Sequence, residues 1–330
     1  MTPSSPSRLL LASLALAACL GSPLDAQGSR GSAKTPPVRP QSSSGEPARW
    51  RRIEVRRLVT PTVSVRFSGS FATLRIVGWA HDSVAITGTV PADARFETGW
   101  AGSESERVGG MKGYLEPADP KGVTLPAGEI EIRVPERARV WSKAGSASID
   151  VSGVRGGLDL AIVGGSIRVA GSPSELRVDA MDGTIEIVGT PQWLRAKSAS
   201  GDIVVRGGSE DAAISTVSGA LRVGDGRFER LRLESVAGAV TFAGELARGA
   251  ALDIDSHGGD VELLTTRKQG ADYELSSIAG RIENRWGTPA PVVGREGRGM
   301  SLAFSTAGGG ARITVRSFKG TIRLGSGKGP

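Results

Sequence analysis

Hydrophobic and polar residues alternate along the central part of the chain, and the alternation itself repeats. Each unit reads approximately L-x-L-x-S-x-x-G-x-I-x-V-x-G, as in Leu176–Gly189 and Leu194–Gly207. Alternation with a period of two is typical of strands with one buried face. The aliphatic residue after the glycine recurs every 18 to 21 residues, at Ile149, Ile167, Ile185, Ile203, Leu221, Val240, Val261 and Ile282. The pattern therefore predicts stacked units of two short strands each.

A repeat of this length predicts the fold class. A strand–helix–strand unit needs about 30 residues, so a helix does not fit. One unit cannot bury its own aliphatic side chains, whereas stacked units form a continuous core. We therefore predict an all-β, single-chain parallel β-solenoid with coils of 18–21 residues, right-handed because parallel crossovers favour that hand. Outward-facing Asp150, Arg168 and Glu186 are expected to stack with alternating charge.

A glycine separates the two strands of each unit. Glycine permits a positive φ or a tight bend that a Cβ atom would obstruct. The turn is therefore expected at the following residues: Gly145, Gly165, Gly183, Gly201, Gly219, Gly238, Gly259 and Gly280.

The flanks follow the alternation less regularly. We predict irregular N-terminal coils over residues 49–140, regular repeats over 141–286 and a C-terminal capping segment over 287–330. Within the first of these, residues 92–127 are expected to form a loop or an edge-covering segment. Caps are needed because an open end of the array is an unpaired sheet edge.

The N-terminal residues predict export. Arg8 precedes an apolar run from Leu9 to Leu20, which is shorter than the roughly 20 residues that span a bilayer and is typical of a signal peptide. Two alternatives remain open: cleavage after residue 26, or a lipobox ending at residue 18 that would leave Cys19 lipidated. Residues 27–48 are rich in Gly, Ser and Pro and predict a disordered tether. The folded part is expected in the periplasm or at the cell surface, with membrane contact only through a lipid anchor.

Composition excludes several kinds of site. Lys plus Arg is 41 and Asp plus Glu is 34, a net charge of +7 that is too dispersed to predict a nucleic-acid ligand. One cysteine excludes a disulfide framework and a thiolate zinc site, and two histidines leave little material for a metal centre. We predict no catalytic, cofactor-binding or metal-binding residues and no cofactor.

Three segments carry a resemblance to a known family. They are IRVPERARVWSKAGSASIDV at 132–151, the repeated G-x-I-x-V-x-G units and ITVRSFKGTIRLG at 313–325. Over residues 60–325 the chain resembles the bacterial putative-adhesin family of unknown function, which consists of β-strand-repeat envelope proteins similar in shape to autotransporter-adhesin heads. The resemblance implies an exported β-repeat domain and supplies no catalytic motif.

The leading functional hypothesis is a non-enzymatic envelope module that binds a polymer or a protein partner, or that serves a structural role. The alternative is a polysaccharide-processing enzyme on a β-helix scaffold, using an acidic outer face. Such chemistry needs clustered acids. Asp253 and Asp255 alternate along one predicted strand, and Glu274 is expected one unit later, which makes these three the best acidic cluster.

Three tryptophans are a second candidate ligand surface. Trp141, Trp193 and Trp286 stand beside predicted turns. Exposed indole rings could stack on sugar rings, whereas buried ones would cover the core or cap an end.

Overall fold

The computed structural model describes residues 49–103, 108–119, 125–294 and 297–326, and this part is all-β. Its strands, in chain order, are β1 (Trp50–Leu58), β2 (Ser64–Trp79), β3 (Ser83–Pro91), β4 (Ala94–Ser103), β5 (Val108–Pro117), β6 (Gly128–Pro135), β7 (Arg139–Ser152), β8 (Gly157–Ala170), β9 (Glu175–Val188), β10 (Trp193–Ser198), β11 (Ile203–Arg206), β12 (Ser209–Thr216), β13 (Leu221–Ser235), β14 (Val240–Ser256), β15 (Val261–Leu264), β16 (Ala271–Ser277), β17 (Ile282–Asn284), β18 (Val292–Val293), β19 (Met300–Thr306), β20 (Ala311–Ser317) and β21 (Ile322–Gly325). The predicted signal peptide, tether and Cys19 lie outside the described residues. Among the described residues, no helix is long and apolar enough to cross a membrane.

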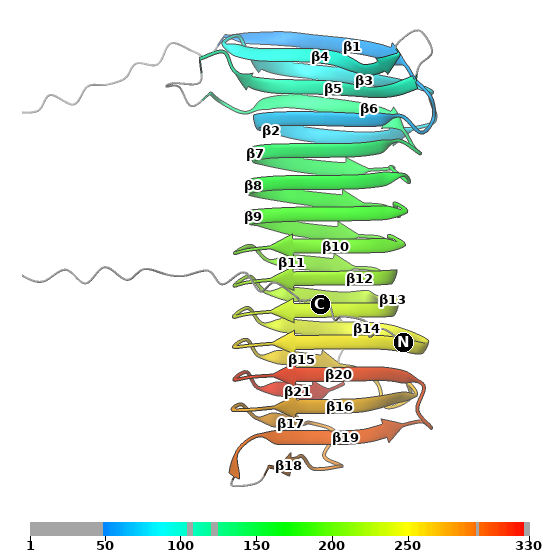
Figure 1. The fold of residues 1–330 in the computed structure, drawn as a ribbon, viewed down its shortest axis with the longest axis vertical. Helices are drawn as coiled ribbons and strands as arrows, with labels where there is room; N and C mark the ends of the chain where they lie inside the picture. The colour runs from blue at the N-terminus through cyan, green and yellow to red at the C-terminus, as the bar shows by residue number, and fades with distance from the viewer. Residues whose placement is uncertain (1–48, 104–107, 120–124, 295–296, 327–330) are drawn as a thin grey trace, which may run out of the picture. The chain divides into compact units, whose positions relative to one another are not determined.

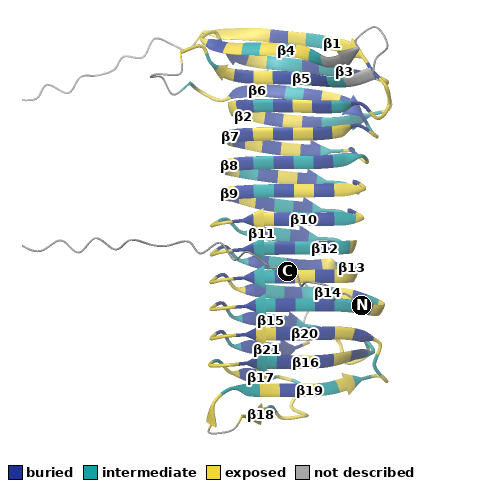
Figure 2. Cartoon of the chain, in the orientation of Figure 1, coloured by how far each residue is buried: buried dark blue, intermediate teal, exposed yellow. Residues whose placement is uncertain are grey.

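Successive units of the repeat pair in parallel and in register, as the alternation predicts (Figure 1). Ile149 lies opposite Ile167, Ile167 opposite Ile185, and Ile185 opposite Ile203. These isoleucines are buried, and each packs on its equivalent from the next unit. Figure 2 shows the resulting alternation of buried and exposed positions along every long strand. The expected charge alternation is also present, because Asp150 lies opposite Arg168 and Arg168 opposite Glu186.

The predicted single-chain parallel β-solenoid is wrong as a description of the whole strand arrangement. Parallel pairs close a ring of five strands in the order β9–β10–β12–β13–β11 and back to β9. The long strands β9 and β13 cause this closure, because each pairs with one neighbour through its first half and with another through its second half. The fold is therefore a closed barrel of five parallel strands with many flanking strands, some of them antiparallel.

The strands that follow the regular repeats do not stack in sequence order. β20 lies between β14 and β16, and β21 lies between β15 and β17, all in parallel pairs (Figure 1). Ile322 therefore separates Val261 from Ile282, and the expected contact between those two is wrong. Beyond β16 the sheet continues through β19 and then β18, both antiparallel to their neighbours.

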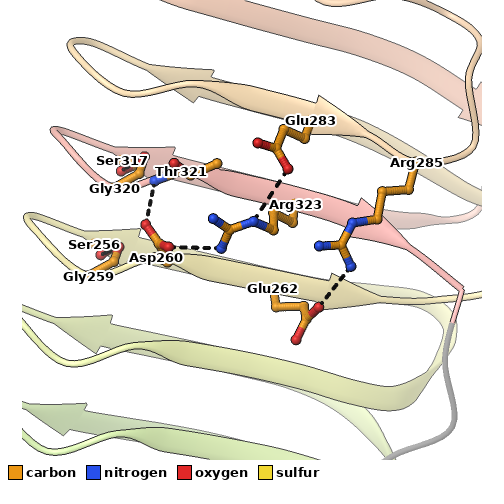
Figure 3. Close-up of polar contacts among 10 residues, drawn as sticks. All are labelled: Ser256, Gly259, Asp260, Glu262, Glu283, Arg285, Ser317, Gly320, Thr321 and Arg323. Carbon is orange, nitrogen blue, oxygen red and sulfur yellow. Dashed lines mark hydrogen bonds and ion pairs between the residues drawn. The ribbon is translucent and has the colours of Figure 1, made fainter.

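Charge favours this position of β21. Glu262 lies opposite Arg323, and Arg323 lies opposite Glu283 (Figure 3). If β15 and β17 were adjacent in sequence order, the two glutamates would face each other, and directly opposed like charges are destabilising. With β21 between them, Arg323 contacts Glu283 at 3.3 Å and Asp260 at 2.8 Å.

The N-terminal strands form a hairpin and an antiparallel run in place of a loop. β4 pairs with β5 in antiparallel fashion, so part of the segment expected as a loop is regular sheet. β5 continues the sheet onto β2, and β2 pairs in parallel with β7. β3 pairs antiparallel with β1 on one side and with β6 on the other, and β6 pairs in parallel with the second half of β2.

Candidate functional site

A corner between the two strands of each unit organises the main groove of the protein. In β7, β8 and β9 the strand passes through this corner unbroken. In six later units it breaks into a three-residue bend, and each of these units has a hydroxyl residue three positions before the corner glycine. These motifs are Ser198-x-x-Gly201, Thr216-x-x-Gly219, Ser235-x-x-Gly238, Ser256-x-x-Gly259, Ser277-x-x-Gly280 and Ser317-x-x-Gly320.

The hydroxyl groups of these motifs are buried and bonded to the backbone of their own turn. Ser198 Oγ accepts a hydrogen bond from the amide of Gly201 at 2.9 Å, and Thr216 Oγ1 accepts one from Gly219 at 3.1 Å. In another unit the hydroxyl is the donor, from Ser256 Oγ to the carbonyl of Gly259 at 2.6 Å. Side-chain bonds of this kind offer the backbone an alternative to the sheet ladder. The motif therefore sets the bend.

Corner glycines lie in contact across neighbouring units. A Cβ atom on Gly201 would lie 1.9 Å from the carbonyl oxygen of Gly183, and one on Gly219 would lie 2.0 Å from that of Gly201. Of the corner glycines predicted from the sequence, only Gly165 has a positive φ, +112°. Most corner positions therefore require glycine because neighbouring backbones approach closely there, and not because the backbone has a positive φ.

Directly beside the corner, successive units expose apolar side chains. Val217 is 52% exposed, Met181 62% and Ile278 65%, which is unusual for side chains of this size. The equivalent positions of successive units, in stacking order, hold Val163, Met181, Ala199, Val217, Val236, His257, Phe318 and Ile278. We call these residues the apolar ladder. Its eight levels are seven strand spacings apart, about 34 Å at roughly 4.8 Å per strand.

The apolar ladder is one wall of a groove with a volume of about 930 Å³. The buried corner residues, among them Ser198, Thr216 and Ser235, form its floor. The opposite wall is a column of outward residues that occupy one register position in successive strands: Lys143, Ala161, Asp179, Lys197, Ser215, Glu234, Asp255, Arg316 and Ser276.

The acidic side chains of this opposite wall form ion pairs with arginines, whereas its two lysines form none with the described residues. Asp179 pairs with Arg177 at 2.9 Å, and Glu234 pairs with Arg232. Lys143 and Lys197 make no ion pair with any described residue. The groove therefore combines an apolar wall, a floor whose hydroxyls are already bonded, and two free cations on its rim.

The structure does not gather the predicted acidic cluster. Glu274 is two strands from Asp253, because Thr314 of β20 lies between them. Asp255 contacts Arg316 at 3.6 Å on one side and Arg232 at 3.7 Å on the other. The expectation that Glu274 follows one unit after Asp253 is wrong, because β20 and its arginines lie between the two acidic strands.

The three predicted tryptophans lie in different surroundings. Trp141 is 36% exposed and lines a second groove. Trp193 is half-buried, with the Arg195 guanidinium 4.2 Å from its ring centre. Trp286 packs edge-on against Tyr273 and Phe304, so it contributes to the core near β19.

Sequence reasoning missed the apolar ladder, although a signal was present. The residue directly after each corner hydroxyl is apolar in most units, for example Val217 after Thr216 and Val236 after Ser235.

Among the described residues, no group of three or more His, Cys, Asp or Glu side chains is placed to hold a metal ion.

Two aspartates that follow corner glycines clamp neighbouring units. Asp260 accepts bonds from the amide of Thr321 and from the guanidinium of Arg323, both at 2.8 Å (Figure 3). These two bonds, the amide first, lower the pKa of Asp260 below its ordinary value. Asp202 repeats the arrangement with Arg222 and the amide of Ala220, and its pKa is lowered by the same two kinds of bond. Both clamps are structural.

Comparison with known proteins finds solved bacterial structures of low sequence identity to this chain. No family model and no curated protein matches its sequence. It is similar to a putative cell adhesion protein from Clostridium sporogenes (8% identity, 84% of this chain and 100% of that one, TM-score 0.24). It is also similar to a putative adhesin from Bacteroides fragilis (12%, 83% and 97%, TM-score 0.44). A third structure is a putative lipid binding protein from Parabacteroides distasonis (14%, 83% and 96%, TM-score 0.42).

The first two descriptions agree with the family resemblance carried by the sequence motifs. The likeness is too low to bring any function to this chain. What the protein binds has to be argued from its own grooves.

Proposed function

We propose that the protein is a non-enzymatic, adhesin-like binding module of the bacterial cell envelope, and that its main groove holds the acyl chain of an anionic lipid. The observation that carries this proposal is the apolar ladder, a continuous row of exposed side chains crossing eight units. A groove of about 930 Å³ lies in the range of about 300–1,000 Å³ typical of ligand sites.

Satisfied hydrogen bonds favour a hydrocarbon occupant. The floor hydroxyls are buried and bonded within their own turns, since the amide of Gly219 donates to Thr216 Oγ1 and Ser235 Oγ donates to the carbonyl of Gly238, so they present little polar surface to a ligand. The backbone of the corner is also bonded between units, for example from the amide of Val217 to the carbonyl of Ser198. An extended peptide would therefore find few hydrogen-bond partners, whereas an acyl chain needs none. Lys143 and Lys197 on the rim suit an anionic headgroup.

Displacement of a fluorescent fatty acid from the purified full-length protein tests this proposal. Palmitate should compete for the groove, and Val217→Asp should weaken its binding by about tenfold or more, because a desolvated charge would meet the acyl chain. Ser218→Asp is the matched control, since it adds the same charge one residue further along, outside the groove. Equal binding by both variants would overturn the proposal.

A separate assay tests the non-enzymatic part of the proposal. The protein is incubated with envelope and extracellular polysaccharides, and the expected result is no chemical change in them. New reducing or unsaturated ends that disappear in Asp255→Asn would instead establish a polysaccharide-processing enzyme.

Export and anchoring are also proposals. If Cys19 carries the lipid, radiolabelled fatty acid should be incorporated in cells and should be lost in Cys19→Ser. A mature N-terminus at Gln27 would show ordinary signal-peptide cleavage instead.

A further inference from the structure

A second groove, of about 650 Å³, lies over β2, β5, β7, β8 and β9. Trp141 of β7 is at its centre, directly between Arg66 of β2 and Asp159 of β8. Ser64, Ser68 and Gly157 also line the groove, and their small size leaves space for a ligand. This groove shares no lining residue with the apolar one, and the inference below does not depend on the proposed lipid site.

Two exposed aromatic rings line the second groove. Trp141 is 36% exposed and Tyr114 is 42% exposed. Tyr114 lies opposite Ser68, two strands and two residues away from Trp141. Strand geometry puts their Cα atoms about 12 Å apart. Two aromatic side chains at this separation suit a ligand with several linked rings better than a ligand with one small ring.

Three cations in this groove have no partner in the described part of the chain. They are Arg66, Lys112 and Arg139, whose side chains make no hydrogen bond or ion pair with any residue described. Arg66 lies opposite Lys112 on one side and Trp141 on the other. Two like charges directly opposed with no counter-ion are destabilising, so an anionic ligand would be stabilised here.

The groove also contains two carboxylates, Asp159 and Glu175. Burial raises the pKa of Asp159, and Arg177 opposes this shift. Carboxylates accept hydrogen bonds from sugar hydroxyls, whereas the phosphodiester groups of a nucleic acid offer them no donor. A ligand that suits this groove therefore presents carboxylates, hydroxyl groups and flat apolar faces together.

We infer that the second groove binds an acidic polysaccharide of the uronic-acid class. The apolar face of one sugar ring stacks on Trp141 and that of another on Tyr114. Uronate carboxylates pair with Arg66 and Lys112, and ring hydroxyls donate to Asp159 and Glu175.

Binding of oligogalacturonate to the purified full-length protein tests this site. Dextran supplies rings without charge, and polyglutamate supplies charge without rings. The expected order is oligogalacturonate well above both. Trp141→Ala and Arg66→Gln should each weaken oligogalacturonate binding by about tenfold or more, as for other central aromatic and arginine contacts.

Matched variants make the result decisive. Trp193→Ala removes an indole that Arg195 covers outside the groove, and Arg52→Gln removes a cation of β1 that lines neither groove; both should bind as the wild type. Trp141→Tyr should keep most of the affinity, and thermal melts should show that all variants are folded. Polyglutamate or single-stranded DNA binding as tightly as oligogalacturonate would overturn the inference, as would unchanged binding by Trp141→Ala.

Discussion

The corner glycines touch one another across neighbouring units, and this contact sets the cost of replacing them. Gly201→Ala would place a methyl group 1.9 Å from the carbonyl oxygen of Gly183. We expect a loss of about 1–3 kcal/mol in the free energy of unfolding, because the backbones must move apart. Urea denaturation measures this loss. Gly99→Ala is the control, since nothing lies within 4 Å of its Cβ position; an equal loss there would contradict the contact explanation.

The corner hydroxyls make a different contribution to stability. Thr216→Val keeps the shape of the side chain but leaves the amide of Gly219 without its partner. We expect a loss of about 1–3 kcal/mol, the usual cost of a buried unsatisfied donor. Ser218→Ala, at an exposed hydroxyl, should cost much less in the same urea titration. If the two variants unfold at the same urea concentration, the hydroxyl does not set the turn.

At the scale of elements, the placement of β20 and β21 is the main departure from sequence order. It can be tested with cysteine pairs in a Cys19→Ser background. Asp253→Cys with Thr314→Cys places two thiols directly opposite in β14 and β20, within the range of about 4.4–6.8 Å between Cα atoms that a disulfide needs. Asp253→Cys with Glu274→Cys places them two strands apart, about 9.6 Å. Oxidation should cross-link the first pair and not the second, as seen by peptide mapping. Cross-linking of the second pair and not the first would show that β14 and β16 are adjacent, in sequence order.

The Asp260 clamp gives the β15–β21 contact a pH dependence. Its pKa is lower in the folded protein than in the unfolded chain, so its contribution to stability is present above the unfolded pKa of about 4 and is lost as the pH falls through the folded value. Nearly half of this side chain is exposed, so solvent screening keeps the contribution small. Asp260→Asn should flatten the decrease in stability between about pH 5 and pH 3, measured by urea titration. An unchanged pH profile would contradict the clamp.

The residue pattern predicts units and faces far better than it predicts their order. Alternation identifies which side chains are buried, and the register of Ile167 on Ile185 follows from it. The segment 313–325 carries the same S-x-x-G motif as the other units, so the motif alone gives it no particular neighbour. Its place is favoured by charges that are far apart in the sequence, with Arg323 in register between Glu262 and Glu283. Barrel closure was equally hidden, because alternation does not show that β9 passes its corner unbroken.

The candidate sites were only partly predictable for the same reason. Trp141 was identified from the sequence, but its cationic neighbours come from β2 and β5, far away in the chain. The prediction that Asp253, Asp255 and Glu274 form an acidic cluster was wrong because β20 lies between β14 and β16. A property of one strand is visible in the sequence, whereas a groove depends on which strands become neighbours.

At the scale of the whole described fold, the two grooves lie on one outer face and approach each other on β7. Trp141 lines one groove and Lys143, two residues later, lines the other. Separate chemistry predicts separate effects: Val217→Asp should change oligogalacturonate binding less than twofold, and Trp141→Ala should change palmitate binding less than twofold. Sites that share no partners are additive within about 0.3–0.5 kcal/mol, so the double variant should show the sum of both single effects. Titration of each ligand in the presence of the other measures any coupling. Strong mutual exclusion would mean that one ligand occupies both grooves through β7, and the lipid and glycan assignments would then have to be replaced by a single amphiphilic ligand.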